Sequence, residues 1–344
     1  MFTEEPKTSE GVYKGNSYYE VDALSNSKLS TILTPHIFFS KSEKLESRAL
    51  LIGSLVDCLL TSPEDFDKLY YMSNSKRPYG KLGKFIEKLA ELGEITEESL
   101  SEAYTEAGYQ ISPKAVNKIF YSSPDNLDYY AALRNSEGKT VITEDEYKIA
   151  FKCIDSIRRS EWSKIYFEKP LDIEGKELLH QIPIYFRYGD RDCKSLLDGI
   201  LIDHDKRTIQ PFDLKTTGSD VYEFEKSMLT FGYYRQAAFY RLALLYNAIQ
   251  NENYLGKLMK QGYKLLPFRF VVVQTTPNVD APSVVYEVSE RDLECGLKGC
   301  DCDGKHYYGI DELITLVEWH EANREYVLPK KLVEASGVLK TQIF

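Results

Sequence analysis

Apolar and polar residues alternate in strand-like runs through the middle of the chain. Two apolar runs, 195–202 and 208–214, flank the polar stretch His204–Arg207, and this pattern is typical of a β-hairpin. The run 178–188 is rich in β-branched and aromatic residues and predicts another strand. After a turn the spacing becomes helical, and the strongly apolar segment 233–245 predicts a helix that packs on a sheet.

Further helices and strands are predicted on both sides of this stretch. Ser25 or Asn26 can cap a short helix that ends near Pro35, and Thr143 with Glu146 forms a capping box. Apolar residues at helical spacing predict helices over the segments 50–59, 143–157 and 310–326. Two β-rich runs, 268–273 and 283–288, predict strands that extend the sheet, separated by a turn containing Pro277 and Pro282.

We expect one domain over residues 1–344. It divides into N-terminal helices at 17–72, a helical insertion at 73–137, a sheet-bearing core at 138–326 and a tail at 327–344. A hydrophobic fraction of 43% is sufficient for a core of this size, and no segment has the apolar length of a membrane span. The N-terminus, MFTEEPKTSEGVYKG, is acidic and polar and does not resemble a secretory signal. We therefore expect a cytoplasmic protein with no membrane partner.

Charged residues inside the predicted hairpin are the first candidates for chemistry. Asp198 interrupts the first apolar run, and Asp213 and Lys215 close the second. Because side chains alternate along a strand, Asp213 and Lys215 project from one face with Leu214 behind them. A carboxylate within an apolar strand is costly unless it is paired or bound to a metal, and Mg²⁺ prefers such oxygen ligands.

The ordered set of Asp198, Asp213-x-Lys215 and Gln236-x-x-x-Tyr240 resembles the PD-(D/E)XK nuclease superfamily. Gln236 and Tyr240 lie four residues apart, on one helix face, and this last motif points to the RecB-like branch. The stretch ALSNSKLSTILTP and the later GKTVITEDEY resemble the exonuclease VIII (RecE-like) type of phage and prophage exonuclease.

The resemblance implies an α/β fold with a restriction-endonuclease-like core, a central mixed β-sheet flanked by helices and helical N-terminal additions. It also implies that Asp198, Asp213 and the carbonyl of Leu214 bind Mg²⁺ or Mn²⁺, and that Lys215 orients or deprotonates the attacking water. By the same resemblance, Gln236 and Tyr240 orient the site and the DNA end.

The activity implied is exonucleolytic hydrolysis of linear double-stranded DNA. ATP is not expected to take part, because no GxxxxGK[ST] phosphate-binding motif occurs in the chain. The family setting is phage recombination or DNA processing in a bacterial or phage-infected cell. Members of the exonuclease subtype assemble into homo-oligomeric rings and work with single-strand annealing proteins, which are therefore expected partners.

Two positions depart from the family pattern. The helix that usually carries Gly-x-x-x-His reads Gly53 to Asp57 here, so that aspartate either replaces histidine as an oxygen ligand or plays no part in the site. The strand that often begins with an acidic ligand has Gln181 at the best-matching position, with Glu177 earlier in the strand and His180 adjacent.

The formal net charge of −10 argues against non-specific coating of nucleic acid but allows a local basic groove. Five basic residues are candidates for contact with DNA phosphates: Lys76, Arg77, Lys226, Arg235 and Arg241. Lys76 and Arg77 belong to a concentrated basic stretch, 76–88, whose alternative interpretation is a solvated loop and helix face.

Six cysteines are present, and without a secretory signal we do not expect a disulfide framework. Some RecB-like nucleases hold an iron–sulfur cluster, but the spacing Cys295-x4-Cys300-x-Cys302 does not match their usual C-terminal triplet, so we interpret it as a surface loop.

Two other functions remain open. One is a RecB-like nuclease that acts on single strands or as an endonuclease. The other is a catalytically silent DNA-end-binding module of the same fold, which the replacements at Asp57 and Gln181 would favour.

Overall fold

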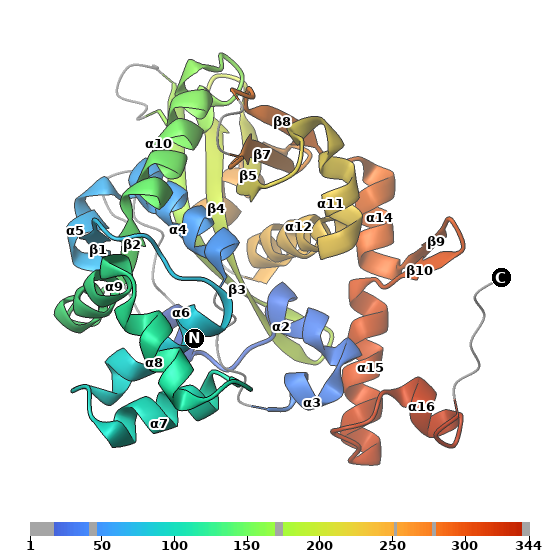
Figure 1. Cartoon of the computed structure of the whole chain (residues 1–344). Helices are drawn as coiled ribbons and strands as arrows, with labels where there is room; N and C mark the ends of the chain where they lie inside the picture. The colour runs from blue at the N-terminus through green and yellow to red at the C-terminus, as the bar shows by residue number, and fades with distance from the viewer. Residues whose placement is uncertain (1–16, 41–46, 169–174, 251–252, 277–279, 339–344) are drawn as a thin grey trace. The chain divides into compact units, whose positions relative to one another are not determined.

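A computed structural model describes residues 17–40, 47–168, 175–250, 253–276 and 280–338 of the chain (Figure 1). Pro277 of the predicted turn and both ends of the predicted single domain lie outside these residues. The chain divides into two compact units. The first holds the described residues of Met1–Ser47, Ser156–Gln274 and Val279–Phe344, and the second those of Arg48–Asp155 and Thr275–Asn278.

The first unit is built on a six-stranded mixed sheet with the order β3-β4-β5-β7-β8 and with β6 (Lys264–Leu265) beside β5. Strands β3, β4 and β5 are antiparallel, β7 runs parallel to β5, and β8 runs antiparallel to β7. The strand bounds are Lys176–Tyr188, Arg191–Asp203, Thr208–Thr217, Arg269–Gln274 and Val284–Glu287 in that order. The predicted hairpin and the three other predicted strands are confirmed.

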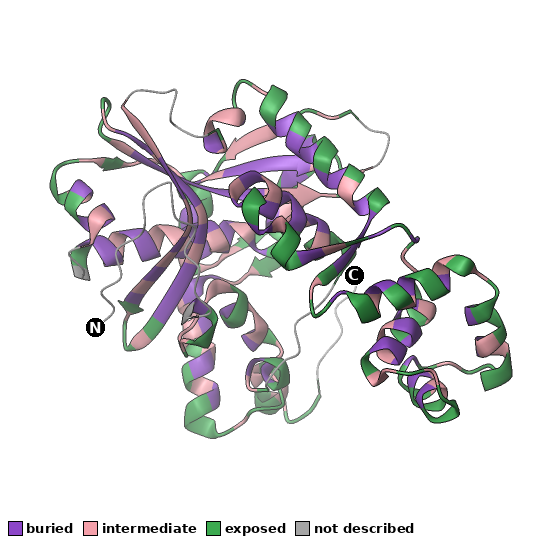
Figure 2. Ribbon diagram, turned by 90° about the vertical axis from the view of Figure 1, so that its left-hand side faces the viewer, coloured by how far each residue is buried: buried purple, intermediate pink, exposed green. Residues whose placement is uncertain are grey.

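Helix α12 (Tyr233–Gln250) lies between β5 and β7 in the chain and makes their parallel pairing possible. It buries Ala237, Phe239, Ala243 and Leu244 in the core shared with the strands. This apolar face explains why the helix could be predicted from sequence. Figure 2 shows the long strands buried along most of their length, as expected for a sheet covered by helices.

The remaining helices of this unit come from both ends of the chain. Ser25 caps α2, because its side chain accepts a hydrogen bond from the N–H of Lys28. The helices are α1 (Ser17–Glu20), α2 (Asn26–Ser30), α3 (Pro35–Phe38), α11 (Phe224–Phe231), α13 (Tyr254–Lys260), α14 (Glu290–Lys298), α15 (Ile310–Asn323) and α16 (Lys330–Glu334). The architecture is thus a mixed α/β fold with a central mixed sheet flanked by helices (Figure 1).

The second unit is mainly helical. Its helices are α4 (Arg48–Thr61), α5 (Phe66–Leu69), α6 (Gly80–Leu92), α7 (Glu97–Glu106), α8 (Pro113–Tyr121), α9 (Pro124–Asn135) and most of α10 (Glu144–Arg159). Two four-residue strands, β1 (Tyr70–Ser73) and β2 (Thr140–Thr143), pair in parallel. This pairing brings residues 70–73 next to residues 140–143, on either side of the predicted insertion at 73–137. The unit extends beyond that insertion, because it runs from Arg48 to Asp155.

Arg77 lies inward and holds the second unit together. Its guanidinium forms a salt bridge with the fully buried Glu146 of α10, with Nε 2.8 Å from Oε1, and also donates to the hydroxyl of Tyr129 and the carbonyl of Val141. The Thr143–Glu146 capping box is confirmed by reciprocal hydrogen bonds of 2.9 and 3.3 Å. Each of the three guanidinium nitrogens donates inside the unit, which disfavours contact of Arg77 with DNA phosphates, and that contact stays a prediction.

The late cysteines also differ from the prediction. Cys295 of α14 and Cys300 of β9 (Cys300–Cys302) form a disulfide, while Cys302 is an exposed free thiol. Strand β9 pairs with β10 (Lys305–Tyr307), and the turn that leads into this hairpin brings the two Cα atoms to 5.1 Å. Within the described residues, no helix combines the length and the apolar character needed to span a membrane.

Candidate catalytic site

Asp198 lies at the point where strands β4 and β5 separate. Their pairing runs from Asp203–Thr208 to Gly199–Phe212 and ends there. Beyond this point the carboxylate of Asp198 takes the place of a backbone partner, because its Oδ2 accepts a hydrogen bond of 2.9 Å from the N–H of Leu214. The two strands of the predicted hairpin therefore bring Asp198 next to the residue that follows Asp213.

Gly199 permits the strands to pack closely at this position. The ring of Phe212 occupies the space where a Cβ would be, with its nearest atom 1.9 Å from the ideal Cβ position. A larger residue at 199 would push β5 away from β4 and move Asp213 relative to Asp198.

Asp213 and Lys215 lie on one face of β5, as predicted. The Nζ atom of Lys215 is 2.6 Å from Oδ2 of Asp213, and both side chains are buried or nearly so. The ammonium also lies over the rings of Tyr233, at 4.6 Å from the centroid, and Phe270, at 5.7 Å. The lysine is thus held between a carboxylate and two aromatic faces.

Burial and charge act against each other on this pair. Burial raises the pKa of Asp213, and the positive charge of Lys215 opposes that rise. Burial lowers the pKa of Lys215, but the charges of Asp213 and Asp198 outweigh this effect and leave the pKa raised. Lys215 is thus favoured in its charged form, and a further positive charge near Asp213 would oppose the effect of burial on the pKa of that carboxyl group.

Helix α12 adds two side chains to the same network. Nε2 of Gln236 donates to Oδ1 of Asp213 at 3.1 Å and to the hydroxyl of Tyr240 at 3.0 Å. Burial, together with the negative charges of Asp213 and Asp198, raises the pKa of Tyr240 well above its ordinary value, so the phenol stays neutral. The structure thus brings all five predicted catalytic residues together.

The donor set fits a hard divalent cation with a partly open coordination shell. Among the described residues there is no group of three or more His, Cys, Asp or Glu able to hold a metal. Two carboxylates and a backbone carbonyl, completed by water and phosphate oxygens, are ligands that suit Mg²⁺ or Mn²⁺.

Gln181 lies opposite Asp198 in the sheet. It falls between the pairs His180–Gly199 and Ile182–Leu197 and has a φ of 50°. Glu177 is distant along the strand, where it pairs with Ile202 and accepts hydrogen bonds from Tyr254 and, at 3.3 Å, from His204. Of the two alternatives for a further ligand near the site, Gln181 is the one whose backbone lies opposite Asp198, and its part in the site stays a prediction.

His180 is a neutral packing residue beside the site. Its Nδ1 is 3.2 Å from the carbonyl of Asp198, and its ring stacks on Phe167 and meets the edge of Phe212. Burial lowers its pKa to about 4, opposed by the hydrogen bond to that carbonyl. Asp57 lies on α4 in the second unit, and its role as a metal ligand stays a prediction.

The basic candidates of the first unit differ in exposure. Arg235 is buried and donates to the carbonyl of Tyr308 and to Ser30 Oγ, which leaves little of its side chain accessible to DNA, and the predicted contact stays a prediction. Arg241 is paired with Glu290 at 2.6 Å, and Lys226 with Glu223 at the same distance. Lys226 is exposed, as is Lys76 of the second unit, and both remain candidates.

Tyr233 is a site residue that sequence reasoning missed. It begins α12 three residues before Gln236, and residues at this spacing share a helix face. That spacing, in a segment already assigned to a helix, was the available signal for an aromatic residue above Lys215.

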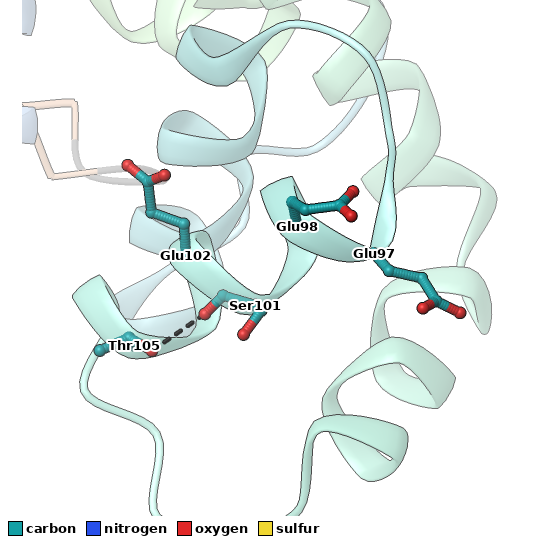
Figure 3. Close-up of a pocket in the computed structure, with 5 residues that line it drawn as sticks. All are labelled: Glu97, Glu98, Ser101, Glu102 and Thr105. Carbon is teal, nitrogen blue, oxygen red and sulfur yellow. Dashed lines mark hydrogen bonds between the residues drawn. The ribbon is translucent and has the colours of Figure 1, made fainter.

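A shallow concavity of about 550 Å³ lies on α7 of the second unit (Figure 3). Its lining residues are Glu97, Glu98, Ser101, Glu102 and Thr105, and Thr105 Oγ1 donates to the carbonyl of Ser101. Three carboxylates would repel a phosphate backbone, so this surface is unsuited to DNA.

No protein-family model and no curated protein matches this chain. Among solved structures, the crystal structure of a "putative exonuclease" from Eubacterium rectale aligns over 97% of this chain and 97% of its own length. The TM-score is 0.43 and the sequence identity 15%. Similarity at this level leaves the function to be argued from the residues themselves.

Proposed function

We propose that this protein is a metal-dependent nuclease of the PD-(D/E)XK type that hydrolyses phosphodiester bonds of DNA. The observation that carries the proposal is the buried pair of Asp213 and Lys215, linked to α12 through Gln236, with Asp198 of the neighbouring strand bonded to the N–H of Leu214 between them. Two carboxylates beside a lysine at the end of a strand pairing supply both a metal site and a group that handles water.

Asp198, Asp213 and the carbonyl of Leu214 would hold Mg²⁺ or Mn²⁺, which polarises the scissile phosphate and lowers the pKa of bound water. Lys215 would orient the attacking water, because its ammonium is fixed by Asp213 and its pKa responds to nearby charge. Gln236 holds one oxygen of Asp213 and thereby leaves the other toward Lys215.

We further propose that the substrate is the end of linear double-stranded DNA, cleaved without ATP. The support is the ordered motif set and the absence from the sequence of a GxxxxGK[ST] phosphate-binding loop. The silent DNA-end-binding module stays a second candidate because Gln181, the residue opposite Asp198, is neutral where the family often has an acidic ligand.

The test uses the purified protein with linear and circular double-stranded DNA in Mg²⁺, Mn²⁺ or EDTA. We expect loss of the linear form alone, only with a divalent metal, and none with Asp213→Ala or Lys215→Ala. Lys206→Ala, a change of an exposed lysine in the turn of the same hairpin, is the matched control and should cleave normally.

Circular dichroism of each variant checks that the fold is retained. Cleavage of the circular form would change the proposal to an endonuclease. Binding of DNA without cleavage in either metal would replace it with the silent binding module.

A further inference from the structure

Phe231 is a large apolar side chain that the fold leaves in solvent. It is the last residue of α11 and is 65% exposed, with Tyr222 and Leu229 also exposed on the same segment. Burial of a phenylalanine side chain stabilises a fold, so exposure of this ring forgoes a stabilising contact. A single exposed apolar residue is common on protein surfaces, but Phe231 also lies close to the candidate site.

Two aromatic contacts connect Phe231 to the catalytic lysine. Its ring centroid is 5.6 Å from that of Tyr233, and the Tyr233 centroid is 4.6 Å from Nζ of Lys215. The exposed ring therefore lies at most about 10 Å from the ammonium, a length of about three base steps along a duplex strand.

The turn that carries Phe231 is rigid. Gly232 adopts the left-handed conformation at the C-cap of α11, with a φ of 68°, and its N–H bonds to the carbonyl of Met228. Its own carbonyl accepts hydrogen bonds from the N–H groups of Arg235 and Gln236, at 3.1 Å each. The buried guanidinium of Arg235 anchors the start of α12 to Tyr308 and Ser30. Phe231 is thus presented by a fixed backbone.

The surface around Phe231 favours a base over a phosphate. Three charged residues lie on this segment: Lys226 and Glu223 pair with each other at 2.6 Å, and Glu225 is an exposed carboxylate that would repel a phosphate. The last turn of α11, where Leu229 and Phe231 are exposed, offers apolar and aromatic surface. Flat aromatic rings accept any nucleobase by stacking, because every base has a π-face, and loss of one such contact weakens binding about tenfold or more.

We propose that Phe231 stacks on an unpaired nucleobase next to the phosphate bound at the Asp198–Asp213–Lys215 site. This inference rests on the proposed nuclease function and narrows its substrate. A base inside a duplex already has both faces stacked, so the ligand is a base in a single strand or one that is released at an opened duplex end.

The experiment compares oligonucleotides that carry a single abasic position at successive distances from the cleaved phosphate. For the unmodified protein, one abasic position should lower kcat/KM about tenfold, the size of one stacking contact. Phe231→Ala should cleave unmodified DNA about tenfold more slowly and show no further loss at that position, whereas Phe231→Trp should behave as the unmodified protein.

Trp162→Ala is the control, since this exposed aromatic residue lies on another segment and its replacement should leave both rates unchanged. A readout without catalysis uses an oligonucleotide with 2-aminopurine at the sensitive position, in EDTA. Its fluorescence should be quenched on binding to the unmodified protein and not on binding to Phe231→Ala.

An equal abasic penalty in the unmodified protein and Phe231→Ala would overturn the inference while leaving the nuclease function intact. The inference would also be overturned if Phe231→Ala cleaved DNA normally but had a changed oligomeric state, because the exposed Phe231 ring would then be a contact between protein chains. If the unmodified protein cleaves none of the DNA substrates, the nuclease function is refuted. The 2-aminopurine fluorescence would then show separately whether Phe231 stacks on a base.

Discussion

At the scale of single residues, Gln236 connects the sheet to helix α12. Its amide uses both N–H groups, one on Asp213 and one on the hydroxyl of Tyr240. A hydrogen bond to a charged group contributes about 1.5–3 kcal/mol. We therefore expect Gln236→Ala to lower kcat about 10- to 100-fold and to raise the Mg²⁺ concentration needed for half-maximal cleavage, because Asp213 loses its fixed orientation.

Tyr240→Phe is the graded comparison for this prediction. It removes only the neutral acceptor of Gln236, worth about 0.5–1.5 kcal/mol, so its loss of kcat should be about tenfold or less. Metal titrations of both variants provide the measurement. A fall in melting temperature with unchanged kcat and metal dependence would show that Gln236 stabilises the fold and nothing more.

Residue types alone predicted which side chains meet at the candidate site but not which basic residues have partners inside the fold. Asp198, Asp213 and Lys215 could be predicted because strand alternation fixes their faces and a charge within an apolar run needs a partner. The internal partners of Arg77 and Arg235 could not be predicted, because they lie far away in the chain. Glu146 is 69 residues from Arg77, and Tyr308 is 73 residues from Arg235.

At the scale of elements, the β4–β5 hairpin depends on Gly199. A Cβ there would meet the ring of Phe212 at 1.9 Å, so the two strands would have to move apart where Asp198 and Leu214 meet. We expect Gly199→Ala to lower the free energy of unfolding by about 1–3 kcal/mol and to abolish cleavage. Urea denaturation and the DNA assay measure the two effects.

Gly218→Ala is the matched control, because no atom lies within 4 Å of its ideal Cβ and its φ is not in the left-handed region. Equal stability of the two variants would show that Phe212 can repack without cost.

Long elements such as β3, β4 and α12 have enough residues for a clear apolar period. Strands β1 and β2, with four residues each, do not, and the disulfide of Cys295 depends on the turn before β9.

At the scale of the whole molecule, the chain divides into a sheet-bearing unit and a mainly helical one. All five predicted catalytic residues and Phe231 belong to the first unit, whereas Asp57 belongs to the second. This division could not be predicted from the sequence, because the second unit is closed by the pairing of β1 with β2 near its ends and no change in composition marks it.

The salt bridge between Arg77 and Glu146 is expected to control the stability of the second unit. Glu146 is fully buried, and removal of one partner from a buried pair typically costs about 3–5 kcal/mol. The N–H of Thr143 and Arg48, 3.8 Å away, would still compensate part of the charge of Glu146, which places the expected cost at the lower end of this range. Arg77→Met should therefore lower the free energy of unfolding by about this amount, as measured by urea denaturation followed by circular dichroism.

Lys76→Met is the control at the neighbouring position, where the side chain is exposed, and should change stability by less than about 0.5 kcal/mol.

If the two units unfold separately, Arg77→Met will shift one transition and leave the other in place. Cleavage measured between those transitions then tests Asp57: activity that persists while the second unit is unfolded would exclude this residue as a metal ligand. Equal stability of Arg77→Met and Lys76→Met would contradict the structural role of the pair.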